Sequence, residues 1–296
     1  MGLKIVELDK TFGSKKVVDN ISIRIRKGEV VGLLGTNGAG KTTTIKMILG
    51  LLKADKGLIT WNEKNIDKTK LSIGYLPEER GLYDKSKIVD QLLFFSRIEG
   101  VEVRKAERRI DYWLEKLEIT EYKYKRAYEL SKGNQQKIQL IVALIHDPEL
   151  LILDEPFSGL DPVNATMLSK IIAEQIEYGK TIVLSSHRME QIESFCEKIY
   201  IMDKGKIVLG GNLGEIKQNY SYQNFILTAT TEIESFFVNK RINYTRKNGE
   251  IIVKIKGFEE SINIINEIKR NNIFLRNFRF MEPSLDEIFV EKVKGI

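Results

Sequence analysis

The sequence predicts an α/β fold followed by a smaller α+β domain. Short apolar runs at residues 29–34, 150–153 and 181–186 end in polar turns, which is typical of buried strands in a parallel sheet. A glycine-rich loop leads from the first run into a helical pattern that carries Ile45, Met47, Ile48, Leu51 and Leu52. Residues 212–296 follow the order strand, helix, strand, strand, helix, strand, which favours a ferredoxin-like module.

The glycine-rich loop matches G-x-x-x-x-G-K-[ST], a pattern of phosphate-binding loops. Its glycines let the backbone approach a ligand closely, and the N-terminus of the following helix attracts an anion. Lys41 offers a point charge to the β- and γ-phosphates, and Thr42 offers a hydroxyl to Mg²⁺. We expect nucleotide binding by Gly35, Thr36, Asn37, Gly38, Ala39, Gly40, Lys41, Thr42 and Thr43.

Two acids follow the second apolar run, and a histidine follows the third. Asp154 can hold Mg²⁺, which leaves Glu155 free to polarise an attacking water as a general base. His187 can contact that water or the γ-phosphate as a neutral imidazole, and the alternative is a surface histidine that caps a helix. The other histidine, His146, ends a helical segment, and we interpret it as a cation near the negative end of the helix dipole.

Composition excludes several classes of protein. No run approaches the roughly 18 apolar residues of a membrane-spanning helix, and the start reads as a strand rather than a signal peptide. The single cysteine, Cys196, rules out a disulfide framework, which agrees with a reducing cytosol. The net charge of +6 is spread among acids, so we expect solvated faces and no nucleic-acid partner.

Together these motifs resemble the ATP-binding subunit of ABC transporters over about the first two-thirds of the chain. The order is the glycine loop, a switch segment ending at Glu78, a signature at 130–135, Asp154-Glu155, a turn at 158–161 and His187. The resemblance implies a P-loop NTPase of the ABC ATPase type over residues 1–211. This ABC ATPase domain is expected to include a helical subdomain at about 83–128. The accessory C-terminal domain, 212–296, is similar to that of export-type ABC ATPases.

The resemblance also implies the roles of individual residues. Phe12 stands where the family stacks an aromatic on adenine, Glu155 is the catalytic carboxylate, and His187 is the switch histidine. Ser131 and Gly133 belong to the signature, which in this family completes the ATP site of the opposite subunit. Glu78 takes the place of a residue that, with Thr42 and Asp154, ligates Mg²⁺.

Three positions depart from the family pattern. Glu78 replaces the usual Gln and adds a negative charge beside the phosphates. Lys132 and Asn134 replace the first Gly and the Gln of the usual Leu-Ser-Gly-Gly-Gln signature. Because Ser131 and Gly133 remain, we expect activity to survive, with Lys132 facing solvent.

The function implied is ATP hydrolysis with Mg²⁺, coupled to transport, with export as the expected direction. The partners implied are an integral membrane permease and a second ATPase subunit, in a homodimer or a paralogous heterodimer, at the cytoplasmic inner face of the membrane. One alternative is a soluble ABC ATPase acting on DNA or ribosomes, although no second cassette, long coiled coil or Cys-rich module supports it. Another is a nucleotide-gated regulator that does not hydrolyse ATP, supported by Glu78 and Lys132 alone.

Overall fold

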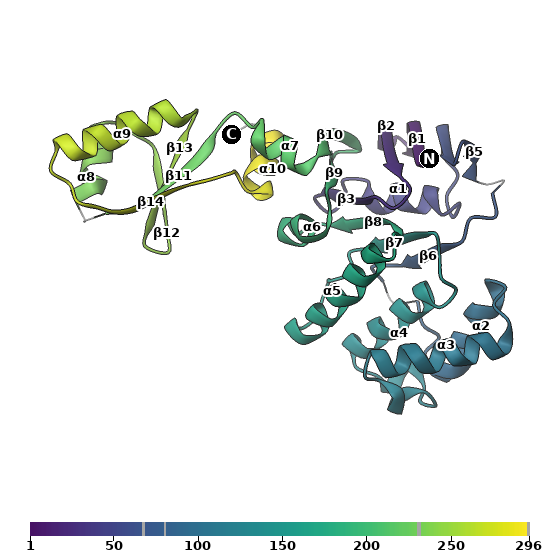
Figure 1. The fold of residues 1–296 in the computed structure, drawn as a ribbon. Helices are drawn as coiled ribbons and strands as arrows, with labels where there is room; N and C mark the ends of the chain where they lie inside the picture. Colours follow the sequence, from purple (N-terminus) through teal and green to yellow (C-terminus); the bar gives the residue numbers. More distant parts are fainter. Residues whose placement is uncertain (67–68, 80, 230–231, 295–296) are drawn as a thin grey trace. The chain divides into compact units, whose positions relative to one another are not determined.

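The computed structural model describes residues 1–66, 69–79, 81–229 and 232–294. The chain forms two compact units, Met1–Gly211 and Asn212–Ile296 (Figure 1). The first is a mixed α/β unit and the second a small α+β unit, so the predicted fold class is confirmed.

A six-stranded sheet of order β10-β9-β3-β8-β7-β6 forms the core of the first unit. Its strands are β3 (Val30–Gly35), β6 (Ile73–Leu76), β7 (Leu150–Asp154), β8 (Thr181–Ser186), β9 (Lys198–Asp203) and β10 (Lys206–Asn212). Every residue of β3, β7 and β8 is buried, which explains their continuous apolar runs. These three strands are parallel neighbours, so the loops after them meet at one edge of the sheet.

A second sheet, of order β2-β1-β4-β5, is antiparallel. Its strands are β1 (Gly2–Phe12), β2 (Lys15–Arg26), β4 (Lys56–Trp61) and β5 (Lys64–Asn65). The alternating residues Leu3, Ile5 and Ile23 point into one apolar cluster together with Ile45 of α1 (Lys41–Ile48) and Leu150 of β7. Helix α1 is therefore anchored by apolar contacts shared between the two sheets.

The structure ends α1 earlier than the apolar pattern predicted. The helix stops at Ile48 because Gly50 adopts a left-handed φ of 69°, and Leu51 N–H donates to Lys46 O at 2.9 Å. This is a glycine-terminated helix end, and it leaves Leu51 exposed. The expectation that the helix continues to Leu51 and Leu52 is wrong.

The remaining helices of the first unit are α2 (Ile88–Ile98), α3 (Val103–Lys116), α4 (Lys132–Leu144), α5 (Pro162–Glu177) and α6 (Met189–Phe195), with short 3-10 turns at η2 (Thr120–Tyr122) and η3 (Ala127–Glu129). Ile88 and Leu92 of α2 are fully buried, as are Ile110 and Leu114 of α3. Ile98 ends α2 and is 64% exposed. Among the described residues, no helix is long and apolar enough to cross a membrane.

The second unit has the strand order β12-β13-β11-β14, all antiparallel. Its elements are α7 (Leu213–Gln218), β11 (Gln223–Ala229), α8 (Glu232–Asn239), β12 (Tyr244–Lys247), β13 (Glu250–Ile255), α9 (Phe258–Arg270), β14 (Leu275–Met281) and α10 (Leu285–Lys294). The sequence predicts the first helix of the ferredoxin-like module over residues 231–238, and Thr231 lies outside the described residues. Helices α8 and α9 cover one face of the sheet and form its apolar core with β11 and β13 (Figure 1). This is the ferredoxin-like arrangement that the sequence predicted.

Candidate functional site

The loop after β3 forms a cavity of about 340 Å³ at the N-terminus of α1. Gly35 and Gly40 have φ of 152° and 105°, and a Cβ at Gly40 would lie 2.7 Å from Val17 O. The loop therefore needs glycine there. The first N–H groups of α1 have no acceptor within the helix, so they can bind an anion. The cavity is lined by Val17, Thr36, Asn37, Gly38, Ala39, Gly40, Lys41, Thr42, Thr43, Glu78 and Glu155.

Lys41 is buried beside the loop. Its Nζ donates to Gly35 O at 2.7 Å and lies 3.3 Å from Glu155 Oε1. Both side chains of the Lys41–Glu155 ion pair are about 5–6% exposed. The ammonium group is thus held at the cavity by neighbouring oxygens that a phosphate can replace.

Glu155 connects three strand ends. It follows β7 with a left-handed φ of 49°, which is unusual for a residue with a side chain. Its Oε2 lies 2.7 Å from His187 Nδ1, which follows β8. The sheet therefore brings Lys41, Glu155 and His187 together, although Lys41 lies 114 and 146 positions before the other two in the sequence. Glu155 contacts both Lys41 and His187 directly.

Asp154 is fully buried beneath this contact. Ser185 Oγ donates to Asp154 Oδ1 at 2.5 Å and accepts from Glu155 N–H at 3.0 Å. Burial raises the pKa of Asp154, and hydrogen bonds from Ser185 and Thr42 oppose that rise. Asp154 Oδ2 is buried with no hydrogen-bond partner among the described residues. An oxygen in this position suits a cation or a bound water.

Glu78 follows β6 and lines the same cavity as Lys41 and Glu155. Its pKa is raised, first by burial and then by repulsion from Glu155 and Asp154, while Lys41 lowers it. The carboxylates of Glu78, Asp154 and Glu155 are thus close enough to repel one another.

The donor set fits Mg²⁺ with help from a nucleotide. Thr42 and the carboxylates of Glu78 and Asp154 supply the hard oxygen ligands that Mg²⁺ prefers. Within the described ranges, however, no three His, Cys, Asp or Glu side chains lie close enough to hold a metal ion. Mg²⁺ in such sites is held by one or two carboxylates plus substrate phosphates, which is the set available here.

The signature residues lie apart from this cavity. Ser131 caps α4, accepting from Asn134 N–H at 3.3 Å, and neither it nor Gly133 is among the described residues that line the cavity. A Cβ at Gly133 would lie 2.6 Å from Asn164 Nδ2, so this glycine packs closely against a side chain of α5. Lys132 is exposed, as expected.

Phe12 ends β1 at the turn into β2, where its ring is 49% exposed and lies 5.5 Å from Lys10 Nζ. Val17, on the other strand of the same hairpin, lines the cavity. The exposed ring is therefore free to stack on a planar group.

The interpretation of His146 as a cation is wrong. The residue is half-buried after α4, and desolvation lowers its pKa, which favours the neutral ring. Its Nε2 lies 3.2 Å from Ile73 O, so the side chain connects the end of α4 to the start of β6.

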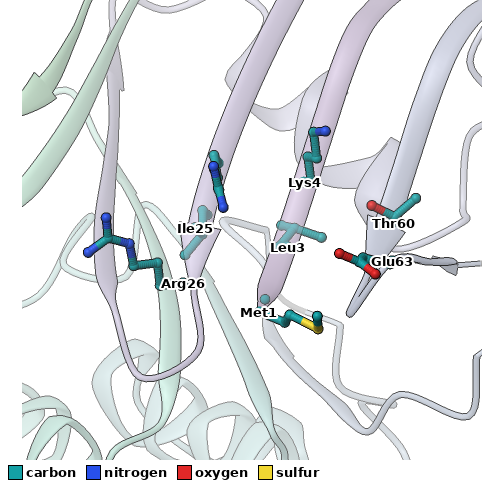
Figure 2. A pocket seen from close by; sticks show the side chains of 9 residues that line it. Met1, Leu3, Lys4, Ile25, Arg26, Thr60 and Glu63 are labelled. Carbon is teal, nitrogen blue, oxygen red and sulfur yellow. The ribbon is translucent and has the colours of Figure 1, made fainter.

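A second cavity, of about 250 Å³, lies on the antiparallel sheet and is lined in part by Lys4, Arg24, Arg26 and Glu63. In Figure 2, Arg26 and Glu63 lie on opposite sides of it. No glycine loop or helix N-terminus lines it, so the chemistry for phosphate resides in the first cavity.

Known proteins match both units. A family model described as ABC transporter matches residues 18–158, and one described as the C-terminal domain of DrrA1-3-like ATP-binding proteins matches residues 211–293. The ABC transporter ATP-binding protein YhaQ of Bacillus subtilis is 43% identical over 99% of both chains. The chain belongs to the ATP-binding proteins of ABC transporters.

Two further ABC proteins extend this comparison. LnrL of Bacillus subtilis, a linearmycin resistance ATP-binding protein, is 32% identical over 97% of each chain. A solved ATP-binding subunit of an ABC transporter is 30% identical with a TM-score of 0.69, covering 74% of this chain and 92% of that one. As an ABC ATPase, the protein binds nucleotide and hydrolyses ATP.

Sequence reasoning missed two residues of the ABC ATPase site. The Ser185 hydroxyl donates to the Asp154 carboxylate and accepts from the Glu155 backbone N–H. The sequence feature that could have identified Ser185 is its place in β8, directly opposite Asp154 in the parallel pair. Val17 lines the cavity from the β1–β2 hairpin, and no motif marks it.

Proposed function

We propose that this ABC ATPase binds MgATP, dimerises head-to-tail and powers export through a separate membrane permease. The observation that carries the proposal is Glu155, which touches both Lys41 and His187 at the edge of the phosphate-loop cavity. A carboxylate in this position can take a proton from water next to a bound γ-phosphate.

In this proposal ATP first displaces the resting contacts of Lys41. The loop N–H groups of Gly35 to Thr43 and the N-terminus of α1 receive the phosphates, and Lys41 turns from Glu155 to the β- and γ-oxygens. Thr42, Asp154 and Glu78 would hold Mg²⁺, which would supply positive charge to offset the negative charge of the phosphates. Glu155 accepts the proton of the attacking water, and Phe12 stacks on the adenine.

His187 keeps Glu155 in place during this step. Its Nδ1 contacts one carboxylate oxygen, which fixes the direction of the other. The phosphates also receive backbone or hydroxyl groups from the rest of the loop, namely Gly35, Thr36, Asn37, Gly38, Ala39, Gly40 and Thr43.

Ser131 and Gly133 have no phosphate within reach in their own chain, so we assign them to the ATP of a partner subunit. The N-terminus of α4, which Ser131 caps, is suited to an anion. The dimer is a homodimer or pairs this chain with a paralogue.

Export and a permease partner are supported by three observations. LnrL, similar over nearly the whole chain, is named for resistance to linearmycin, and the second unit matches a DrrA-like domain. The described residues contain no helix that could cross a membrane, so the translocation path would lie in another protein. We place the chain at the cytoplasmic face of the membrane.

Substitution of Glu155 by Gln tests the proposed chemistry. It keeps the shape of the side chain but removes the base, so we expect hydrolysis to fall by about 10²–10⁴-fold and an ATP-bound dimer to accumulate. Phosphate release and size-exclusion chromatography measure the two effects. The matched control is Glu149→Gln, an exposed acid just before the same strand. Turnover in Glu155→Gln equal to that of the control would refute the role.

A further inference from the structure

The phosphate-loop cavity carries more negative charge than its one lysine can neutralise. Glu78 and Glu155 line it, Asp154 lies behind them, and Lys41 is the only ammonium group among its described lining residues. Lys41 is already paired with Glu155 at 3.3 Å. Glu78 and Asp154 therefore have no lysine or arginine partner among the ion pairs of the described residues.

These acids repel one another across the cavity. Glu78 lines the same cavity as Glu155, and the buried Asp154 directly precedes Glu155 in the chain, so Glu78 lies near the charges that a phosphate would also meet. A triphosphate brings about four more negative charges at neutral pH into the same space. Entry without a cation is therefore opposed by each of these carboxylates.

The carboxylates of the described residues do not form a cation site by themselves. No group of three His, Cys, Asp or Glu side chains within the described ranges could hold a metal ion. The cation thus needs phosphate oxygens, and the phosphates need the cation. We infer that Glu78 strengthens this mutual dependence, because its charge weakens ATP binding when no divalent cation is present.

This inference rests on the proposed nucleotide site, but it concerns one residue of that site. The chain offers a matched control, because Glu79 is also exposed and follows Glu78 directly. Glu79 is not among the residues that line the cavity, and its hydrogen bond to Gln139 uses its backbone oxygen. Replacing either acid by Gln removes the same charge from the same segment.

The test is equilibrium binding of a non-hydrolysable ATP analogue to the full chain, with Mg²⁺ and with EDTA. Calorimetry gives the ratio of the two affinities in wild type, Glu78→Gln, Glu78→Ala and Glu79→Gln. We expect Glu78→Gln and Glu78→Ala to bind the analogue in EDTA about tenfold more tightly than wild type, with less change in Mg²⁺, because one partly screened charge has been removed. Glu79→Gln should keep the wild-type ratio.

Each other outcome contradicts a defined claim. A wild-type ratio in Glu78→Gln overturns the inference and leaves the proposed function standing. A change in only one of the two Glu78 variants, or an equal change in Glu79→Gln, overturns the assignment to the charge of Glu78. Failure of the wild type to bind the analogue even with Mg²⁺ overturns the proposed function itself.

Discussion

Ser185 connects the two acids of the site through a single hydroxyl. It donates to Asp154 and accepts from the backbone N–H of Glu155, so one side chain fixes both. The sequence predicted the acids because they follow an apolar run, but the partner of a buried carboxylate depends on strand register. Leu150 pairs with Thr181, which places Asp154 opposite Ser185. Nothing in the local sequence specifies that register.

Replacing Ser185 by Ala should destabilise the protein without nucleotide by about 1–3 kcal/mol, because it removes a hydrogen-bond donor from the buried Asp154 carboxylate. Urea unfolding measures the loss. The control is Ser169→Ala in α5, where the hydroxyl bonds only to the backbone of its own helix, at Ala165 O. Equal losses in the two variants would show that the Ser185–Asp154 bond contributes nothing specific.

At the scale of elements, apolar runs predicted β3, β7 and β8 well because all their residues are buried. The ends of elements were less predictable. Helix α1 ends at Ile48, just before the left-handed Gly50, although the apolar pattern continues to Leu52. The sequence also did not show how the strands are ordered, so it could not predict that Val17, from a different sheet, would line the cavity. Contacts of this kind depend on tertiary packing, which local propensity does not encode.

The contact of β6 with α4 depends on Gly74. A Cβ at this position would lie 2.1 Å from Ala143 O and 2.8 Å from Pro148 Cγ. Gly74→Ala should therefore push the strand and helix apart and cost about 1–3 kcal/mol of the free energy of unfolding. Because β6 leads into Glu78, nucleotide affinity should fall as well.

Urea unfolding and nucleotide titration measure the two effects of Gly74→Ala. Gly81→Ala is the control, since the nearest atom to its Cβ would be 3.8 Å away. A Gly74→Ala protein as stable as the Gly81→Ala protein would contradict the close approach of β6 and α4.

At the scale of the whole molecule, the family's motifs divide into two sets. One cavity is lined by the phosphate loop with Lys41, by Glu78 and by Glu155. Ser131 instead caps α4, away from that cavity in the same unit. The sequence predicted both sets, and the family resemblance implied that the signature serves the ATP of the opposite subunit. In the proposed head-to-tail dimer, each ATP would use the cavity of one copy and the signature of the other.

A mixture of two inactive variants tests this assembly. Lys41→Ala removes the phosphate contact of its own cavity, and Ser131→Asp keeps an acceptor for the helix cap but places a negative charge toward the partner's phosphate. Each variant alone should be nearly inactive.

In a mixed dimer, one site joins the intact cavity of the Ser131→Asp chain to the intact signature of the Lys41→Ala chain. If subunits exchange freely and the two sites act independently, an equal mixture should recover about a quarter of wild-type phosphate release, because half the dimers are mixed and each has one good site. Ser131→Asn, which caps the helix without the charge, is the control and should retain activity alone. A mixture no more active than its two components would contradict a site shared between subunits.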